Sequence, residues 1–555
     1  MSHSLGIMAE SNLLTINNLQ VSFPSENGKV DALRGISFSL KKGETLGIVG
    51  ESGSGKSMTA LAIMGLLPDA ASMQSEGLFF EKKPGETIRL DALQAADYQK
   101  LRGNEIAMVF QEPMTSLNPV FRCGEQVVEA ILLHQKIGKD EAKQQVLALF
   151  ETVKLPDPER IWHSFPHQLS GGQRQRVMIA MALSCNPSLL IADEPTSALD
   201  VTVQRSVLDL LKTLKQTWGG STIFISHDLA VVAEVADNVL VMKNGEIVEQ
   251  GSVADIFKNP KHSYTQLLLE NFKKRTAPAN HHSPITNHQS PILTIKNLQT
   301  FFTSASNFFG KAKTQVHAVD DVNLDIYEGE TLGLVGESGS GKTTLGRSIF
   351  KLINPNSGEV IFEGKNLLQQ AEKHWFSTRK DLQIIFQDPY SSLNPRQPIG
   401  LALTEPMEVH RLFSNEKKRR EKAVELLETV GLEAGHFWRF PHEFSGGQRQ
   451  RICIARALAL EPKLIVCDEC LSALDVTVQS QILDLLQVLQ KERGLTYLFI
   501  SHDLNVVRQI SDRIAVMKEG KIVEIGAANE FFSNPKSGYT QQLLAAIPSG
   551  MRDTG

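Results

Sequence analysis

Two stretches of this 555-residue chain carry the residues needed to bind phosphate groups. Each follows an apolar run and fits G-x-x-x-x-G-K-[ST], a pattern in which glycines let successive backbone amides face an anion at a helix N-terminus. In such loops the lysine reaches the β- and γ-phosphates of a nucleotide, and the hydroxyl ligates Mg²⁺. The sequence therefore predicts two sites for a nucleoside triphosphate and its magnesium ion. The predicted residues are Gly50, Gly53, Gly55, Lys56 and Ser57 in the first stretch, and Gly336, Gly339, Gly341, Lys342 and Thr343 in the second.

Pairs of adjacent carboxylates end two other apolar runs, Asp193 and Glu194 after SLLIA and Asp468 and Glu469 after LIVC. Ligands of open α/β sheets bind at the carboxyl ends of the strands. The aspartate of each pair is predicted to hold Mg²⁺, and the glutamate to polarise the attacking water. Taken alone, an acidic pair at a strand end is more often a solvated surface feature than a catalytic site. The spacing between the pair and the other motifs therefore decides between these two interpretations.

These motifs belong to a long internal repeat. Six segments return in the same order about 275 to 286 positions later, among them GETLG, SGGQRQR, SALDVTVQ and FISHDL. In both copies 23 positions separate the serine of SGGQRQR from the aspartate of the acidic pair, and 34 positions separate that aspartate from the histidine of FISHDL. The chain therefore contains two copies of one domain, and the equal spacings favour the catalytic interpretation of the acidic pairs.

The elements that must position these residues alternate along each copy. Short apolar runs at 45–50, 188–193 and 222–226 predict buried parallel strands, and 58–67 and 203–214 have helical spacing. The span 125–154, rich in Ala, Leu, Gln and Glu, predicts a separate helical insertion ahead of SGGQ. We therefore expect an α/β fold with a first domain at 12–270, a Pro-containing linker at 271–291 and a second domain at 292–548.

With these motifs the sequence resembles the ATP-binding cassette (ABC) ATPases, over nearly the whole chain outside the linker and tails. The resemblance implies two tandem P-loop NTPase domains, each with a helical signature subdomain, that bind ATP and Mg²⁺. It assigns Gln111 and Gln387 to sensing Mg²⁺ and the γ-phosphate and to linking with a membrane partner. It also places His227 and His502 at the γ-phosphate as catalytic residues beside Glu194 and Glu469. The implied magnesium ligands are Ser57, Gln111, Asp193, Thr343, Gln387 and Asp468.

The resemblance also implies two further groups of nucleotide contacts. One is the SGGQ signature, which closes over the nucleotide of the opposite site and comprises Ser170, Gly171, Gly172 and Gln173, and Ser445, Gly446, Gly447 and Gln448. The other is an aromatic side chain that stacks on adenine, matched by Phe23 and Phe302. For both phenylalanines a packed position in a strand is the alternative, and Phe301 competes with Phe302.

The second copy departs from the family pattern at a few positions. Phe444 stands where Leu169 precedes the first signature, and Cys470 follows Glu469 where the first copy has Pro195. Cys467 and Cys470 form a nominal C-x-x-C, but no second pair completes a zinc site. No cysteine follows Cys470, so we expect no iron–sulfur cluster. Both copies keep the lysine, aspartate, glutamate and histidine, which predicts two active sites.

Other segments indicate a branch of the family. The loops QEPMTSLNP and QDPYSSLNP and the tails at 259–270 and 534–548 are similar to those of peptide and nickel importer ATPases, and 444–463 resembles the glutathione importer ATPases. The resemblance implies an ATP-hydrolysing subunit that energises the import of small peptides, with glutathione-, dipeptide- or oligopeptide-like substrates. The implied partners are two integral-membrane permeases and, through them, a periplasmic substrate-binding protein.

Composition fits this interpretation better than its rivals. Lys and Arg number 57 against 62 Asp and Glu, a balance that disfavours a nucleic-acid partner, and five cysteines indicate a reducing compartment. The sequence contains neither a membrane-spanning apolar stretch nor a signal peptide pattern, so we expect a peripheral protein on the cytoplasmic side of the inner membrane. The alternatives are a soluble tandem ABC ATPase acting on ribosomes or DNA, and an exporter subunit. The short, Pro-broken linker, the few cysteines and the missing membrane helices count against them.

Overall fold

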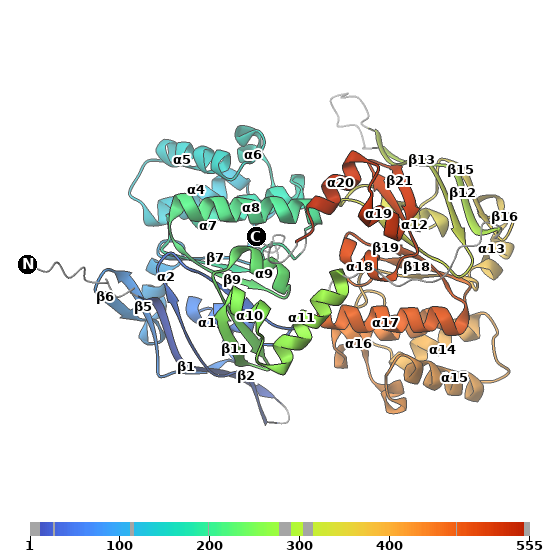
Figure 1. Ribbon diagram of the computed structural model, residues 1–555, viewed down its shortest axis with the longest axis horizontal. Coiled ribbons are helices and arrows are strands. Elements are labelled where there is room, and N and C mark those ends of the chain that lie inside the picture. The colour runs from blue at the N-terminus through green and yellow to red at the C-terminus, as the bar shows by residue number, and fades with distance from the viewer. Residues whose placement is uncertain are drawn as a thin grey trace, which may run out of the picture. The chain divides into compact units, whose positions relative to one another are not determined.

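The computed structural model describes residues 12–25, 28–111, 116–197, 199–276, 290–303, 315–472 and 474–548. These residues form two compact units, whose main division falls after Phe272, while Asp200–Thr202 group with the second unit. Each unit contains a mostly parallel sheet, an antiparallel sheet and a group of helices (Figure 1). None of the helices described is both long and apolar enough to cross a membrane.

The mostly parallel sheet of the first unit holds the predicted apolar runs. From edge to edge its strands are β11 (Glu246–Ser252), β10 (Asn238–Lys243), β3 (Thr45–Val49), β9 (Ser221–Ser226), β8 (Leu189–Asp193) and β7 (Ile106–Val109). Every residue of β3, β8 and β9 is buried, as continuous apolar runs covered on both faces require. The helix α1 (Lys56–Met64) follows β3, whereas α8 (Val201–Trp218) connects β8 to β9 and α9 (Leu229–Val235) connects β9 to β10. The predicted strands and helices of this core are confirmed, with their ends shifted by a few residues.

An antiparallel sheet, which the sequence did not predict, packs against this core. Its order is β2 (Gly28–Lys41), β1 (Asn12–Ser25), β5 (Gly77–Lys83) and β6 (Glu86–Arg89), with β4 (Ser72–Gln74) also paired to β1. The end of β2 alternates buried Phe38 and Leu40 with exposed Ser37 and Ser39. Its apolar face and that of the parallel sheet share one hydrophobic core, so this sheet covers one side of α1 (Figure 1). The short helix α2 (Ala95–Leu101) follows β6.

The helical insertion predicted at 125–154 is confirmed and consists of two helices. The helices are α4 (Cys123–His134) and α5 (Lys139–Thr152), and α6 (Pro158–His163) and α7 (Gly171–Leu183) follow. The helical conformation is interrupted between His134 and Lys139, where Gly138 is extended and forms the N-cap of α5. Apolar residues four positions apart, such as Val146 and Phe150, are fully buried in a core shared by these helices. Figure 1 shows α4 to α7 gathered at the end of the unit away from β1 and β2.

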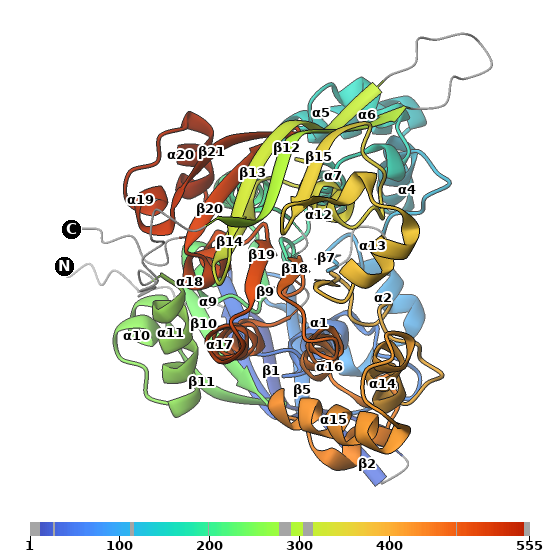
Figure 2. The same ribbon diagram turned by 90° about the vertical axis from the view of Figure 1, so that its right-hand side faces the viewer.

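The second unit repeats this plan. Its mostly parallel sheet runs β17 (Leu382–Ile385), β18 (Leu464–Asp468), β19 (Thr496–Ile500), β14 (Thr331–Val335), β20 (Arg513–Lys518) and β21 (Lys521–Ala527), and its antiparallel sheet runs β13 (Gln315–Tyr327), β12 (Pro291–Thr303), β15 (Ser357–Phe362) and β16 (Lys365–Asn366). Its helices are α12 (Lys342–Ile349), α13 (Glu372–Thr378), α14 (Ile399–Val409), α15 (Glu416–Thr429), α16 (Gly446–Leu458), α17 (Val476–Arg493) and α18 (Leu504–Ile510). Figure 2 shows α14 and α15 at the opposite end of the unit from β12, β13 and β15. The predicted pair of α/β domains, each with a helical subdomain, is confirmed.

Each unit ends in a helical pair. The first pair is α10 (Val253–Lys258) and α11 (Ser263–Thr276), and the second is α19 (Ala528–Ser533) and α20 (Gly538–Ala545). Helix α11 continues through the first six residues of the predicted linker, because Asn271 is buried and Phe272 packs edge-on against Phe257. Residues 277–289 of that linker lie outside the described residues, and its last residue, Pro291, begins β12. The domain limits therefore stay a prediction.

Candidate active site

The predicted phosphate loop of the first unit joins β3 to α1, and close backbone packing explains its glycines. A Cβ atom on Gly50 would lie 2.2 Å from the Met242 carbonyl oxygen, and one on Gly55 would lie 2.8 Å from the Ala32 carbonyl oxygen. Gly55 also has a φ of 101°, which L-residues rarely adopt. The Ser54 hydroxyl is buried in the loop without a hydrogen-bond partner among the described residues. The loop thus has the tight curl and the spare donor that a phosphate group requires.

The second loop, between β14 and α12, is built in the same way. Cβ atoms on Gly336 and Gly341 would lie 2.1 and 1.9 Å from the carbonyl oxygens of Met517 and Ala318. The middle glycines differ, because a Cβ there would meet nothing within 4 Å. Gly53 and Gly339 are required only by their φ values of 79° and 82°.

The lysine of each loop folds back onto the loop itself. The Lys56 ammonium donates to the carbonyl oxygens of Gly50 and Glu51 at 2.7 and 2.9 Å, and Lys342 donates to those of Gly336 and Glu337 at 2.8 Å. Both side chains are buried. Burial lowers the pKa of Lys342, although the Glu469 and Asp468 carboxylates oppose that shift. Each site therefore presents a buried cation at the mouth of the loop.

Four of the six predicted magnesium ligands meet in pairs at the carboxyl ends of β8 and β18, whereas the other two, Gln111 and Gln387, hydrogen-bond to Glu194 and Glu469. The Ser57 hydroxyl donates to Asp193 Oδ1 at 3.2 Å, and the Thr343 hydroxyl donates to Asp468 Oδ1 at 3.0 Å. Burial raises the pKa of both aspartates, against the opposing effect of these hydroxyl hydrogen bonds. Asp468 Oδ2 is buried and accepts no hydrogen bond from the described residues. A carboxylate with a spare oxygen beside a hydroxyl is the donor set that Mg²⁺ takes, so these residues fit the ion.

Arg347 makes the second magnesium site different from the first. Its Nε lies 3.7 Å from Asp468 Oδ2, and its side chain is 41% exposed. The matching residue of the first copy is Leu61, five positions after Lys56 as Arg347 is after Lys342. A permanent cation beside one ligand opposes the binding of a second cation.

Arg347→Leu is therefore expected to tighten metal binding at the second site. The gain should be about three- to tenfold, because the guanidinium is partly exposed and screened by solvent. Electron paramagnetic resonance titration with Mn²⁺ and an ATP analogue measures it, and Leu61→Arg should weaken the first site correspondingly. Unchanged Mn²⁺ affinity in both variants would contradict this role.

The carboxylate of Glu194, the predicted general base of the first site, is contacted by two side chains from different segments. Its Oε2 accepts a hydrogen bond from Gln111 Nε2 at 3.0 Å and lies 3.2 Å from His227 Nδ1. Burial raises the pKa of Glu194, but the hydrogen bond and charge of His227 outweigh it, so the net pKa is lowered. The backbone of Glu194 is left-handed, with a φ of 46°, and its amide donates to the Ile225 carbonyl of β9. Such a conformation turns the side chain out of the strand line toward the loop.

The second site repeats this group with slightly longer distances. Glu469 Oε2 lies 3.2 Å from Gln387 Nε2 and 3.5 Å from His502 Nδ1, and the φ of Glu469 is 48°. Burial lowers the pKa of His502, but its hydrogen bond to Glu469 outweighs burial and raises the net value. In each unit the structure thus brings lysine, hydroxyl, aspartate, glutamate, glutamine and histidine together.

The signature residues are not part of that group in the structure. Ser170 is the exposed N-cap of α7, where its hydroxyl accepts from the Gln173 amide at 3.3 Å while the Gln173 side chain accepts from the Ser170 amide at 3.1 Å. Ser445 and Gln448 form the same capping box on α16. The glutamine of SGGQ therefore has a structural role that the sequence interpretation missed, although S-x-x-Q before a helix is its known signal.

The two signature glycines differ in their surroundings. A Cβ on Gly172 would lie 2.4 Å from Val203 Cγ1, and one on Gly447 would lie 2.5 Å from Val478 Cγ1. The nearest atom to a Cβ on Gly171 or Gly446 would be a leucine methyl at 3.5 or 3.6 Å. Packing within the unit explains only the second glycine. The nucleotide contacts predicted for Ser170 to Gln173 and Ser445 to Gln448 stay predictions.

The aromatic candidates differ in exposure. Phe23 is half-buried and packs against the core shared by the two sheets. Phe302 on β12 is 45% exposed, whereas the ring of its neighbour Phe301 lies 4.2 Å from that of His317. Exposure favours Phe302 over Phe301 for stacking on a base. The adenine contact itself stays a prediction.

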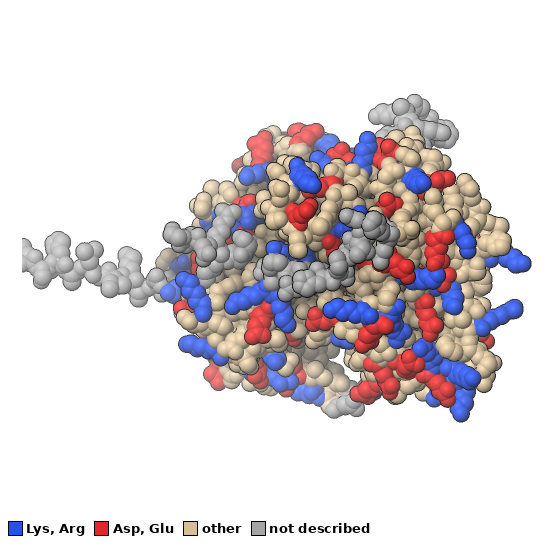
Figure 3. Space-filling model, turned by 45° about the vertical axis from the view of Figure 1, so that its right-hand side comes forward, with Lys and Arg blue, Asp and Glu red and all other residues tan. Residues whose placement is uncertain are grey.

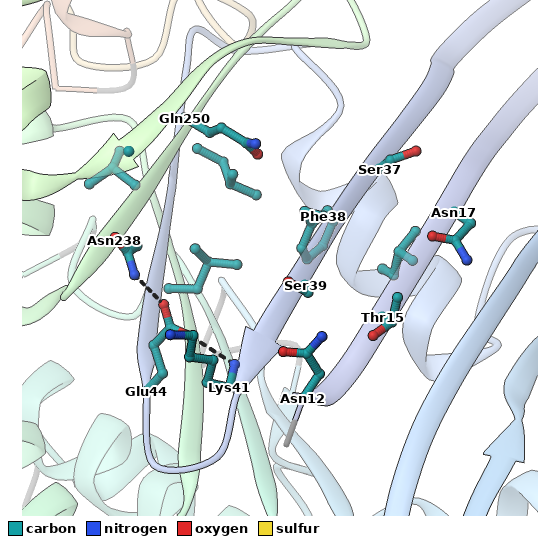
Figure 4. Close-up of a pocket in the computed structure, with 15 residues that line it drawn as sticks. Asn12, Thr15, Asn17, Ser37, Phe38, Ser39, Lys41, Glu44, Asn238 and Gln250 are labelled. Carbon is teal, nitrogen blue, oxygen red and sulfur yellow. Dashed lines mark hydrogen bonds between the residues drawn. The ribbon is translucent and has the colours of Figure 1, made fainter. Parts of the chain in front are cut away.

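A polar cavity of about 580 Å³ lies elsewhere in the first unit (Figure 4). It is lined at the amino ends of β3 and β10, whereas the phosphate loop follows the carboxyl end of β3. Within it Asn238 donates to Glu44 Oε1 at 2.6 Å. In the second unit Arg513 stands at the position of Asn238, donates to Glu330 and stacks over Tyr327. The cavity of the first unit is separate from the candidate site.

Comparison with known proteins gives matches over most of the chain. The family described as ABC transporter matches residues 33–197 and 319–472. The family described as Oligopeptide/dipeptide transporter, C-terminal region, matches residues 248–300 and 523–554. The chain is 49% identical to proteins called glutathione import ATP-binding protein GsiA from Escherichia coli and Shigella sonnei. Both alignments cover 97% of this chain and 90% of the relative.

Proposed function

The chain belongs to the ABC transporter family, and from that membership we propose that it hydrolyses ATP to drive the import of small peptides, glutathione among them. The observation that carries this proposal is the repeated group of lysine, hydroxyl, aspartate, glutamate and histidine at each phosphate loop. The peptide class is supported by the oligopeptide/dipeptide region after each cassette and by the relatives named for glutathione import. No comparison supports the alternative of action on ribosomes or DNA.

The geometry supports a division of labour within each site. We propose that Lys56 and the loop amides bind the β- and γ-phosphates, and that the attacking water gives its proton to Glu194 as the new bond to phosphorus forms and the bond to ADP breaks. Gln111 and His227 orient the Glu194 carboxylate, to which both lie within 3.2 Å. Lys342, Glu469, Gln387 and His502 do the same in the second unit. Mg²⁺, held by Ser57 and Asp193 and by Thr343 and Asp468, would supply charge neutralisation at the phosphate oxygens.

Exposed apolar side chains near the first glutamine and a groove beside the second support permease partners. Phe110, Val120 and Phe121, which flank the first glutamine loop, are 40%, 71% and 53% exposed. In the second unit a groove of about 490 Å³ runs between the glutamine loop and α14, with Glu405 and Arg456 among its lining residues. Exposed apolar side chains rimmed by polar ones are typical of protein interfaces. We propose two integral-membrane permeases as partners, one for each unit, and a periplasmic substrate-binding protein that acts through them.

The proposed location follows from these partners. A subunit that binds ATP and docks on permeases acts from the cytoplasmic side of the inner membrane as a peripheral protein.

The surface charge gives no support for a nucleic-acid partner. On the face shown in Figure 3, acidic and basic side chains are interspersed rather than gathered into one basic field. Nucleic-acid-binding proteins usually show such a basic field.

Reconstitution tests the proposed function. The protein should co-purify with two membrane proteins, and its ATP hydrolysis in proteoliposomes should rise at least severalfold when a glutathione-loaded binding protein is added. The same binding protein loaded with an unrelated sugar serves as the control. Co-purification with ribosomes or DNA, together with hydrolysis stimulated by either of them, would overturn the proposal.

A further inference from the structure

A tyrosine from the C-terminal helical pair contacts each phosphate loop. The Glu51 amide donates a hydrogen bond to the Tyr264 hydroxyl oxygen at 3.0 Å, and the Glu337 amide donates to the Tyr539 hydroxyl oxygen at 3.2 Å. Tyr264 and Tyr539 are 3% and 9% exposed. Each tyrosine belongs to an NPK-x-x-YT segment that follows a cassette. The same contact therefore occurs twice, between segments more than 200 positions apart.

The peptide group that each tyrosine holds is also held by the catalytic lysine. The carbonyl of Gly50 and the amide of Glu51 belong to one peptide plane. Lys56 donates to that carbonyl at 2.7 Å, and the amide on the other side donates to Tyr264. In the second unit Lys342 and Tyr539 hold the plane between Gly336 and Glu337 at 2.8 and 3.2 Å. The orientation of this plane therefore determines where the lysine ammonium rests.

Each tyrosine is itself fixed by a glutamate and a lysine. Glu249 on β11 accepts from the amides of Lys261 and His262 at 2.8 and 3.0 Å, which anchors the turn before α11. Lys243 lies over the Tyr264 ring, 4.8 Å from its centre. In the second unit the corresponding residues are Glu524, Lys536, Ser537, Lys518 and Tyr539, with closely similar distances. Each tyrosine is thus a rigid support rather than a mobile side chain.

We infer that Tyr264 and Tyr539 are positioning residues for nucleotide binding, which fix the first peptide plane of each phosphate loop so that its lysine meets the phosphates. This inference rests on the proposed ATP binding, and it gives the C-terminal segment of each cassette a part in the nucleotide site. A tyrosine that only tied α11 or α20 to the sheet would affect stability alone. The nucleotide affinity and the rate of hydrogen exchange at the amide that each tyrosine contacts, Glu51 or Glu337, distinguish the two roles.

Replacing both tyrosines by phenylalanine removes the acceptor oxygens and keeps the rings. Since one hydrogen bond within a folded protein contributes roughly a fivefold factor, we expect Tyr264→Phe with Tyr539→Phe to weaken binding of a fluorescent ATP analogue about five- to tenfold. Hydrogen exchange at the Glu51 and Glu337 amides should accelerate at least tenfold. The two single variants, which disturb folding less, should each show the effects at one site.

Tyr98→Phe is the matched control, because Tyr98 is buried and its hydroxyl has no hydrogen-bond partner among the described residues. It should leave affinity and amide exchange unchanged. If the wild type binds the analogue and the double variant binds it with an affinity within twofold of wild type, the inference about the tyrosines is overturned, while the proposed ATP binding stands. A wild type that bound no analogue would instead refute the proposed ATP binding on which the inference rests.

Discussion

Replacing Glu194 and Glu469 together by glutamine is expected to leave ATP bound and almost uncleaved. Glutamine keeps the shape of each side chain but cannot accept a proton from water. The loss of a general base typically lowers turnover by about 10²- to 10⁴-fold. Binding should survive, because Lys56, Lys342 and the loop amides are untouched.

Two measurements separate these effects. Single-turnover hydrolysis of radiolabelled ATP gives the rate of cleavage, and the melting-temperature shift caused by ATP reports binding. Glu86→Gln with Glu372→Gln is a matched control, since both residues are exposed acids outside the site. Turnover of the Glu194→Gln and Glu469→Gln variant within about threefold of wild type would refute the general-base assignment.

The parallel core was predictable because its strands are buried on both faces. Runs such as TLGIV at 45–49 and LLIAD at 189–193 are fully buried, and they read as continuous apolar sequence. The antiparallel sheet was missed because β1 and β2 change register repeatedly, for example between Ile16 and Leu19. Asn18 there has a φ of 48°, so buried and exposed positions do not alternate regularly along β1. A bulged strand gives no clear period-2 signal.

The site was predictable where one motif supplies several of its groups. The phosphate loop places lysine and hydroxyl side by side, and the paired aspartate and glutamate follow directly from a strand end. The contact between Tyr264 and the Glu51 amide was not predictable, because a backbone amide leaves no trace in the sequence. Arg347 could have been found by comparing the two copies, where it replaces Leu61.

Removing the phosphate-loop lysines is expected to abolish ATP binding without unfolding the protein. Both side chains are buried, but they bond mainly to carbonyls of their own loops, so their loss disturbs packing little. The same lysines also stabilise the charge that develops on the phosphate during cleavage, so their loss should lower the rate of any remaining hydrolysis by about 10²- to 10³-fold. A ligand at 100 times its dissociation constant stabilises a protein by about 2.7 kcal/mol. Lys56→Ala with Lys342→Ala should lose most of that stabilisation while its melting temperature without ATP stays near that of wild type.

The single variants test whether both sites are needed. Neither copy lacks a catalytic side chain, and the two groups around Glu194 and Glu469 differ by at most 0.3 Å in matched distances. Lys56→Ala and Lys342→Ala should therefore each lower peptide uptake into proteoliposomes severely. Lys100→Ala, which removes an exposed lysine paired with Asp97, should not. If one loop variant transported normally while the other was inactive, the sites would be functionally unequal, and the Arg347 difference at the second magnesium site would be the first place to look for the cause.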